Sequence, residues 1–147
     1  ELGNNALLVA ALGFAGEGRP FAPWKGRDLG LRVSCDLDRD ELLARVAAAV
    51  GETPKLAPGG PGRVRELGVI TGGAGSQIYE LAATGIDTFL TGEGPHWSYT
   101  AAEELGVNLI YAGHYATETF GVKALAARWV AEFSGIEVCF IDHPTGL

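Results

Sequence analysis

Methionine is absent from all 147 residues of the sequence, including the first position. A chain that begins Glu1-Leu2-Gly3 has neither a translational start residue nor a signal peptide, so we expect it to be part of a longer protein. No run of about 18 apolar residues occurs either, which argues against a helix that crosses a membrane. A membrane partner is therefore not expected.

Cysteine is scarce as well. The two cysteines, Cys35 and Cys139, form neither a paired metal-binding motif nor a disulfide framework. This usage favours a reducing compartment, and the cytoplasm is the expected location. Each cysteine is interpreted as a small apolar packing residue rather than a reactive thiol.

Basic residues are outnumbered: 11 lysines and arginines against 18 acidic residues give a net charge of −7. Such a surface repels phosphate backbones and carries no basic stripe, so nucleic-acid binding is not expected. An acidic surface is compatible with a cation site, and equally with simple solubility.

Apolar residues and glycine are abundant. Apolar residues make up 47% of the chain, enough for one domain with a hydrophobic core. Glycine occurs 22 times, about twice its usual share, which indicates many tight turns. The glycine- and proline-rich stretch 58–62 divides the chain into an N-terminal portion, residues 1–57, and an α/β portion, residues 63–147.

Short apolar runs alternate with helical patterns along the chain. Strands are expected over residues 29–35, 53–57, 67–71, 86–90, 107–111 and 136–141. Helices are expected over 6–12, 39–50, 77–83, 98–105 and 115–133, and residues 16–26 are expected to form a loop. This alternation predicts an α/β fold: a mostly parallel sheet with helices on its faces, in three layers.

The first of three polar loops in this pattern is the stretch TGGAGS at residues 71–76. Its backbone N–H groups could hold an anion, but it lacks the lysine of a P-loop and the third glycine of a dinucleotide fingerprint. A tight connection is the alternative interpretation. A Rossmann-type nucleotide domain is accordingly disfavoured.

The other two loops carry imidazole and carboxylate groups. Glu93 and His96 follow one expected strand, and alone each would be a helix cap or a solvated residue. His114 and Glu118 follow the next strand, four residues apart at the start of a helix, so both side chains can reach one ion. A surface hydrogen bond between this pair is the alternative. Because parallel strands end at the same edge of a sheet, all four side chains are expected to face one cleft.

Several motifs resemble the NGG-interacting-factor-like family of dinuclear metal-centre proteins, whose members are often named GTP cyclohydrolase I type 2. These motifs are GVITGGAGSQI, GIDTFLTGEGPHWSY, NLIYAGHYATETFGVKAL and EVCFIDHPTGL, all within residues 68–147. The opening stretch, ELGNNALLVAALGF, is similar to the segment that follows the family's aspartate ligand. Residues 15–66 carry little resemblance.

The resemblance implies two divalent metal ions (Zn, Fe, Mn, Ni or Mg) held by two adjacent histidines, an aspartate, and a further histidine and glutamate. The last two map onto His114 and Glu118, whereas the other ligands have no counterpart in this sequence. The chain is therefore expected to be the C-terminal part of a two-part metal-binding fold. The resemblance also implies a homo-oligomer, with a hexamer expected.

A pair of divalent ions suits hydrolysis, because the ions activate a water and clamp a substrate oxygen. The predicted function is a dinuclear metal-dependent hydrolase whose small-molecule substrate is GTP, another nucleotide or a phosphate ester. Glu93 or His96 would orient a metal ligand or act as general acid or base. No residue is a guanine-specific contact, so GTP rests on the resemblance alone. The alternative is a non-catalytic ring-forming scaffold or protein-interaction module with a structural metal centre.

Overall fold

Six strands of the chain pair into one sheet. The computed structural model describes residues 2–145. The strands are β1 (Arg19–Trp24), β2 (Arg27–Asp38), β3 (Lys55–Pro58), β4 (Arg63–Ile70), β5 (Thr88–Thr91) and β6 (Asn108–Tyr111). Their order across the sheet is β1-β2-β4-β5-β6-β3.

The sheet is mixed, so the expectation of a mostly parallel sheet is only partly right. The central strands β4, β5 and β6 are parallel, but β1 with β2, β2 with β4 and β3 with β6 are antiparallel. The first antiparallel pair follows from its two-residue turn, where Lys25 and Gly26 both have positive φ, 47° and 79°. That geometry matches the right-handed twist of a hairpin and leaves no room for a crossover.

Helices cover both faces of the sheet, which confirms the predicted three-layer α/β fold. The helices are α1 (Asn4–Ala11), α2 (Arg39–Val50), α3 (Ile78–Ala82), α4 (Trp97–Leu105) and α5 (His114–Glu132), with a short 3₁₀ turn, η1 (Gly75–Gln77). As predicted, α2 begins after Asp38, whose carboxylate accepts a hydrogen bond from Asp40 N at 2.9 Å. It ends at Gly51, whose φ of 79° is the left-handed conformation that glycine adopts most readily.

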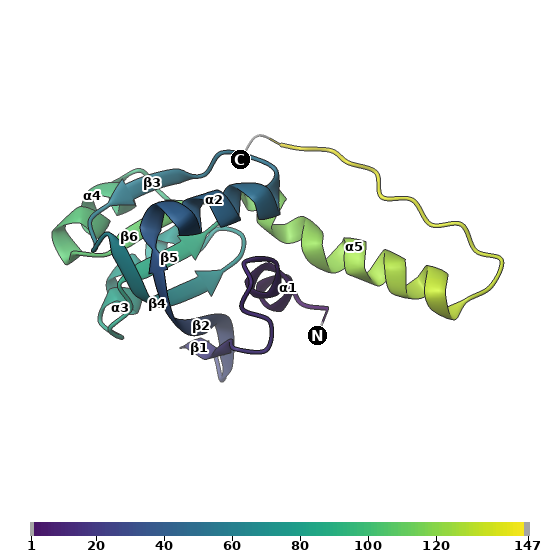
Figure 1. Cartoon of the computed structure of the whole chain (residues 1–147), viewed down its shortest axis with the longest axis horizontal. Coiled ribbons are helices and arrows are strands. Elements are labelled where there is room, and N and C mark those ends of the chain that lie inside the picture. Colours follow the sequence, from purple (N-terminus) through teal and green to yellow (C-terminus); the bar gives the residue numbers. More distant parts are fainter. Residues whose placement is uncertain (1, 146–147) are drawn as a thin grey trace.

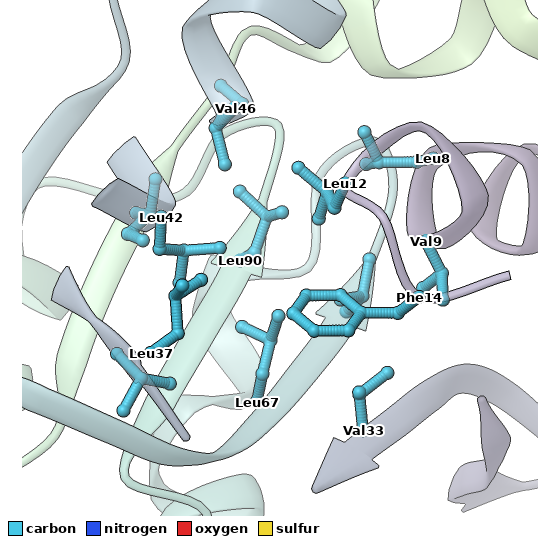
Figure 2. Close-up of a cluster of buried hydrophobic side chains, with 14 residues drawn as sticks. Leu8, Val9, Leu12, Phe14, Val33, Leu37, Leu42, Val46, Leu67 and Leu90 are labelled. Atoms are coloured by element: carbon cyan, nitrogen blue, oxygen red, sulfur yellow. The ribbon is translucent and has the colours of Figure 1, made fainter. Parts of the chain in front are cut away.

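Two hydrophobic clusters hold the layers together. On one face, α1 and α2 direct leucine and valine side chains onto β4 and β5, as Figure 2 shows for Leu8, Leu42, Leu67 and Leu90. On the other face, α3 and α4 pack around Phe89, which is fully buried. In the central strands β4, β5 and β6, neighbouring apolar side chains point to opposite faces, so both clusters depend on the same strands.

Two elements differ from the sequence prediction. Residues 16–26 were expected to be a loop, but they contain β1, an edge strand that tolerates Pro20 and Pro23 because one side of it has no partner strand. Residues 136–141 were expected to be a strand, but residues 136–145 have no helix or strand. The position beside β6 is taken by β3, and the segment instead turns back after the end of α5 and runs toward the body (Figure 1).

The stretch 58–62 connects β3 to β4, so the portions before and after it contribute strands to the same sheet. The predicted division into residues 1–57 and 63–147 stays a prediction. Within residues 2–145, no helix combines the length and the apolarity that a membrane crossing requires.

Candidate functional site

The carboxyl ends of the three parallel strands meet at one edge of the sheet. Ile70 of β4 is in register with Thr91 of β5, and Thr91 with Tyr111 of β6. The loops that follow are tied together by backbone hydrogen bonds, from Gly92 N to Gly72 O at 2.8 Å and from Gly113 N to Gly92 O at 3.0 Å. The predicted shared edge is therefore confirmed.

His114, the first residue of α5, lies between two carboxylates at this edge. Its Nδ1 is 2.7 Å from Glu93 Oε1, and its Nε2 is 3.3 Å from Glu118 Oε2. Helix periodicity brings Glu118 one turn along the same face, and the loop after β5 brings Glu93 to the other ring nitrogen. All three side chains are partly exposed, at 37% for His114, 41% for Glu93 and 47% for Glu118. A ligand can therefore reach them from solvent.

The two carboxylates change the titration of the imidazole. The hydrogen bond with Glu93 is the largest cause that raises the pKa of His114 above its ordinary value, and the charge of Glu118 adds to it. Partial burial opposes these effects without cancelling them. The two carboxylates thus give the site a negative electrostatic potential, which attracts a cation or a proton to the ring.

Gly72 makes room for this group of side chains. A Cβ on Gly72 would lie 2.6 Å from Glu118 Oε1 and 3.3 Å from His114 Nε2, and its φ is +74°. A larger residue would therefore be strained and would displace the Glu118 carboxylate. Gly73 differs, because its Cβ would meet His114 and Glu93 only at ordinary contact distances of 3.4–3.5 Å.

Two buried threonines fix the loop of Gly72 against α5. Gly72 N donates to Thr117 Oγ1 at 3.0 Å, and Thr91 Oγ1 donates to Gly72 O at 3.1 Å. Thr91 Oγ1 also accepts from Ala74 N at 3.2 Å. The sequence analysis did not single out either threonine; the only signal was their position, one ending β5 and the other three residues after His114.

Of the predicted site residues, the structure brings Glu93, His114 and Glu118 together but not His96. His96 is exposed at the N-terminus of α4, and within residues 2–145 no hydrogen bond or ion pair joins its ring to the other three. The single cleft expected for all four side chains therefore holds three of them. A catalytic role for His96 stays a prediction.

A pocket of about 250 Å³ opens beside Glu93 and Gly113. Lys55 forms part of its far wall, because β3 pairs antiparallel with β6 and places Lys55 opposite Tyr111. The remaining lining comes from Glu52, Thr53, Gly92, Gly94 and Ala112. The sequence analysis missed Lys55, since nothing in a four-residue edge strand reveals which strand it pairs with.

The other side of His114 is covered by the end of the chain. A second pocket of about 240 Å³ is lined by His114, Glu118, Phe140 and Thr145, among others. Tyr115 holds this end in place, because its hydroxyl donates to Asp142 Oδ1 at 2.9 Å and accepts from His143 N at 2.7 Å.

The donors fit part of a metal centre. Two ligand atoms each about 2.0–2.1 Å from one tetrahedral ion lie roughly 3.3 Å apart, which is the spacing of His114 Nε2 and Glu118 Oε2. Glu93 binds the opposite ring nitrogen, so it does not converge on the same point. In agreement, residues 2–145 contain no group of three or more His, Cys, Asp or Glu side chains that could hold an ion. His114 Nε2 and Glu118 Oε2 thus have the spacing of two ligands of one ion, and Glu93 lies at the other ring nitrogen.

Known proteins are similar to this chain in sequence and in fold. The family model described as Duf34/NIF3 (NGG1p interacting factor 3) matches residues 1–146. A "GTP cyclohydrolase 1 type 2 homolog" of Deinococcus radiodurans is 41% identical over 100% of this chain and 56% of its own length. The protein of that name from Halobacterium salinarum is 40% identical over 100% and 59%.

A solved structure agrees with these sequence matches. The crystal structure of the protein TTHA1606 from Thermus thermophilus superposes with a TM-score of 0.81 at 36% identity, covering 100% of this chain and 57% of that one. The chain thus spans little more than half the length of the relatives it matches.

Proposed function

The chain belongs to the Duf34/NIF3 family, and on that premise we propose that it supplies His114 and Glu118 as ligands of a divalent metal centre. The centre would serve a hydrolase that acts on a nucleotide or another phosphate ester. The single observation that carries the proposal is the row of side chains Glu93–His114–Glu118 at the carboxyl edge of the parallel strands.

The row supports metal binding because each side chain has a distinct task. Glu93 accepts the Nδ1 proton of His114, which fixes the ring and leaves Nε2, on the side of Glu118, as the nitrogen for a metal ion. Glu118 contributes the negative charge, and Gly72 leaves its carboxylate the space it occupies. A carboxylate on the remote nitrogen of a metal-binding histidine is a recurrent arrangement in metal sites.

A complete metal centre needs more ligands than His114 and Glu118. Tight sites use at least three protein ligands, and no group of three such side chains occurs within residues 2–145. We propose that the remaining ligands, two adjacent histidines and an aspartate by family resemblance, come from outside these 147 residues. With them, two divalent ions per subunit are expected.

When bound, the ions would lower the pKa of a coordinated water and polarise a phosphoryl oxygen. The residues of this chain would hold and orient the substrate around that water. Glu93 keeps the imidazole of His114 in one orientation, and the glycine loops leave the site open on the side of the Lys55 pocket. The name of the relatives suggests a guanine nucleotide as the first substrate to test.

The test uses the complete protein and measures metal per subunit together with turnover of nucleotides and phosphate esters. Glu118→Gln and His114→Ala should each lower the content to one ion or fewer per subunit and abolish hydrolysis. The matched control is Glu132→Gln, which makes the same change in the same helix at a carboxylate paired with Arg128 at 3.8 Å. Unchanged metal content with a lowered melting temperature would show that the pair only stabilises the start of α5.

A second candidate function is a non-catalytic, ring-forming scaffold with a structural metal centre. The observation that favours it is the exposed apolar surface of α5 and the following segment, which includes Trp129, Phe133 and Ile141. On this candidate, the complete protein binds metal and forms homo-oligomers, hexamers by resemblance, but turns over none of the substrates above. Metal-dependent turnover that His114→Ala abolishes would exclude it.

A further inference from the structure

We propose that Lys55 binds a phosphate group of the ligand, in the pocket that adjoins Glu93. This inference rests on the proposed function, because it names the charged group that the same site would recognise. It assigns the ligand's phosphate to one side of His114 and the metal ligands to the other.

The register of the sheet places Lys55 at the site. β3 runs antiparallel to β6, so its first residue lies beside Tyr111 at the edge where the parallel strands end. The pocket between them is also lined by Glu93 and Gly113, and Gly113 immediately precedes His114. The pocket therefore adjoins both the residue that precedes His114 and the carboxylate that its ring contacts.

Lys55 differs from the other lysines in having its ammonium available. The sequence has three lysines. Lys25 lies over the ring of Trp24 at 4.2 Å, and Lys123 lies over the ring of Phe140 at 4.7 Å. Among residues 2–145, the side-chain ammonium of Lys55 has no ion-pair, hydrogen-bond or aromatic partner. An exposed lysine on the wall of a concave site can therefore give all three of its donors to a ligand.

The charges around the pocket make this cation necessary for an anionic ligand. The chain carries a net charge of −7, and the pocket lining includes the carboxylates of Glu52 and Glu93. A phosphate would be repelled there unless a positive group faced it, and Lys55 is the one basic residue of the lining in the part of the chain that the structure describes. Lysine commonly binds phosphate in this way, as a point charge.

The phenol of the lining, Tyr111, is already engaged. Tyr111 OH is hydrogen-bonded to Ser98 Oγ, and Ser98 in turn donates to Pro95 O, so the tyrosine proton is directed to the serine. Tyr111 therefore does not donate to the ligand. The hydroxyl of Thr53 is neutral, so Lys55 is the group of the lining that can balance the ligand's negative charge.

The pocket's size limits what enters it. Sites that bury a drug-sized ligand occupy about 300–1,000 Å³, and this one measures about 250 Å³. It suits one phosphate group rather than an entire nucleotide. The rest of a nucleotide would lie outside, past the glycine loops.

The test measures binding in the complete, metal-loaded protein, by calorimetry, with inorganic phosphate, GTP and guanosine as probes. Lys55→Gln should weaken phosphate and GTP binding about tenfold or more, because a hydrogen bond to a charged group is lost. Guanosine binding should not change. Lys55→Arg should retain the affinity for phosphate to within about threefold, and Lys25→Gln, at a lysine outside the pocket, should have no effect.

Three outcomes separate this inference from the proposed function. Equal phosphate binding by the wild type and Lys55→Gln would overturn it, and would mean that Lys55 only protects the edge of the sheet. Loss of metal in Lys55→Gln would also overturn it, because the residue would then act on the metal site. If instead no substrate is hydrolysed but phosphate binding still depends on Lys55, the inference holds and the proposed hydrolase fails.

Discussion

The folded body, residues 4–121, and the C-terminal segment, residues 122–145, differ in how far their apolar side chains are buried. In the body, the apolar residues of the sheet and helices form two buried clusters. In the segment, α5 runs away from the sheet and the chain returns as extended backbone (Figure 1). Most of the exposed large apolar side chains belong to it: Val122, Leu125, Trp129, Val130, Phe133, Ile136, Phe140 and Ile141.

The difference shows that the spacing of apolar residues can predict a helix without predicting which surface packs against it. The helix expected over 115–133 is present, yet its apolar residues Val122, Leu125 and Trp129 are exposed in the described part of the chain. The same helix begins inside the body, where Thr117 is fully buried and Gly121 N donates to Asn4 Oδ1 at 2.7 Å. The boundary between the two regions therefore crosses α5 after its second turn.

The comparison predicts unequal responses to truncation of large apolar side chains. Phe89→Ala, in the body, removes a fully buried ring and should lower the free energy of unfolding by about 3–5 kcal/mol. Trp129→Ala, in the segment, truncates a side chain that is 49% exposed and should change it by no more than about 0.5 kcal/mol.

Denaturant unfolding of the 147-residue chain measures both values. Similar losses of stability in the two variants would mean that Trp129 is packed as firmly as the core. If Trp129→Ala lowers the oligomeric state of the complete protein but leaves the unfolding of the chain alone unchanged, Trp129 stabilises a contact between subunits.

A second prediction concerns the place where the body meets α5. Gly72→Ala puts a Cβ at 2.6 Å from Glu118 Oε1 on a residue with φ +74°, which should cost about 1–2 kcal/mol and move the carboxylate. Gly73→Ala is the matched control, because its Cβ meets only ordinary contacts. The measurements are the melting temperature of the chain and metal content of the complete protein. Equal behaviour of the two variants would contradict the close approach described here.

How much of this could be predicted from the sequence depends on the range of the interactions involved. Helix α2 was predictable because its start and end signals, Asp38 and Gly51, lie within the helix's own turns. The pair His114 and Glu118 was predictable for the same reason: four residues along one helix fix their distance. The edge shared by Glu93 and His114 followed from parallel strands in sequence.

Long-range pairing was not predictable in the same way. The antiparallel addition of β3 beside β6 brought Lys55 to the pocket and left residues 136–141 without a place in the sheet. His96 lies only three residues from Glu93, yet at the start of α4 it stays exposed and apart from the other three side chains. Each wrong or missing prediction concerned either which strand pairs with β6 or where a side chain points, and local spacing determines neither.

A smaller effect is expected from pH, through a carboxylate that joins strands of the body. Burial alone would raise the pKa of Glu66, but hydrogen bonds from Arg32 Nε at 2.7 Å and Ser34 Oγ at 2.8 Å lower it below its ordinary value of 4.5. Because the folded-state pKa is lowered, the stabilisation is present above about pH 4.5 and is lost as pH falls through the folded-state pKa. Glu66→Gln should remove less than about 1 kcal/mol at pH 7 and flatten this acid limb.

Chemical denaturation at steps from neutral pH down to about pH 3 measures that limb. Glu132→Gln, at an exposed ion pair in the segment, is the control and should leave the curve unchanged. An acid limb of equal steepness in wild type and Glu66→Gln would show that other carboxylates cause it.

The smallest effect, one without a change in stability, is a difference in thiol reactivity between the two regions. Burial is the main cause that raises the pKa of Cys35, in the body, to about 11, and the nearby carboxylates of Asp87, Glu66 and Asp36 add to it. At about pH 8 its thiolate, the reactive form, is then roughly one part in a thousand. Cys139 lies exposed in the segment. One thiol per chain should therefore react rapidly with an alkylating reagent, and the second only after denaturation.

Two variants identify the reactive thiol by mass spectrometry. Cys139→Ser should abolish the rapid reaction, whereas Cys35→Ser should leave it unchanged. Two rapid thiols in the native chain would mean that β2 opens to solvent and that the body is less firmly packed than its buried clusters indicate. Slow reaction of both would mean that residues 136–141 are covered, for example by a second copy of the chain. Repeating the reaction over a range of protein concentrations separates that case, because protection by a second copy grows with concentration.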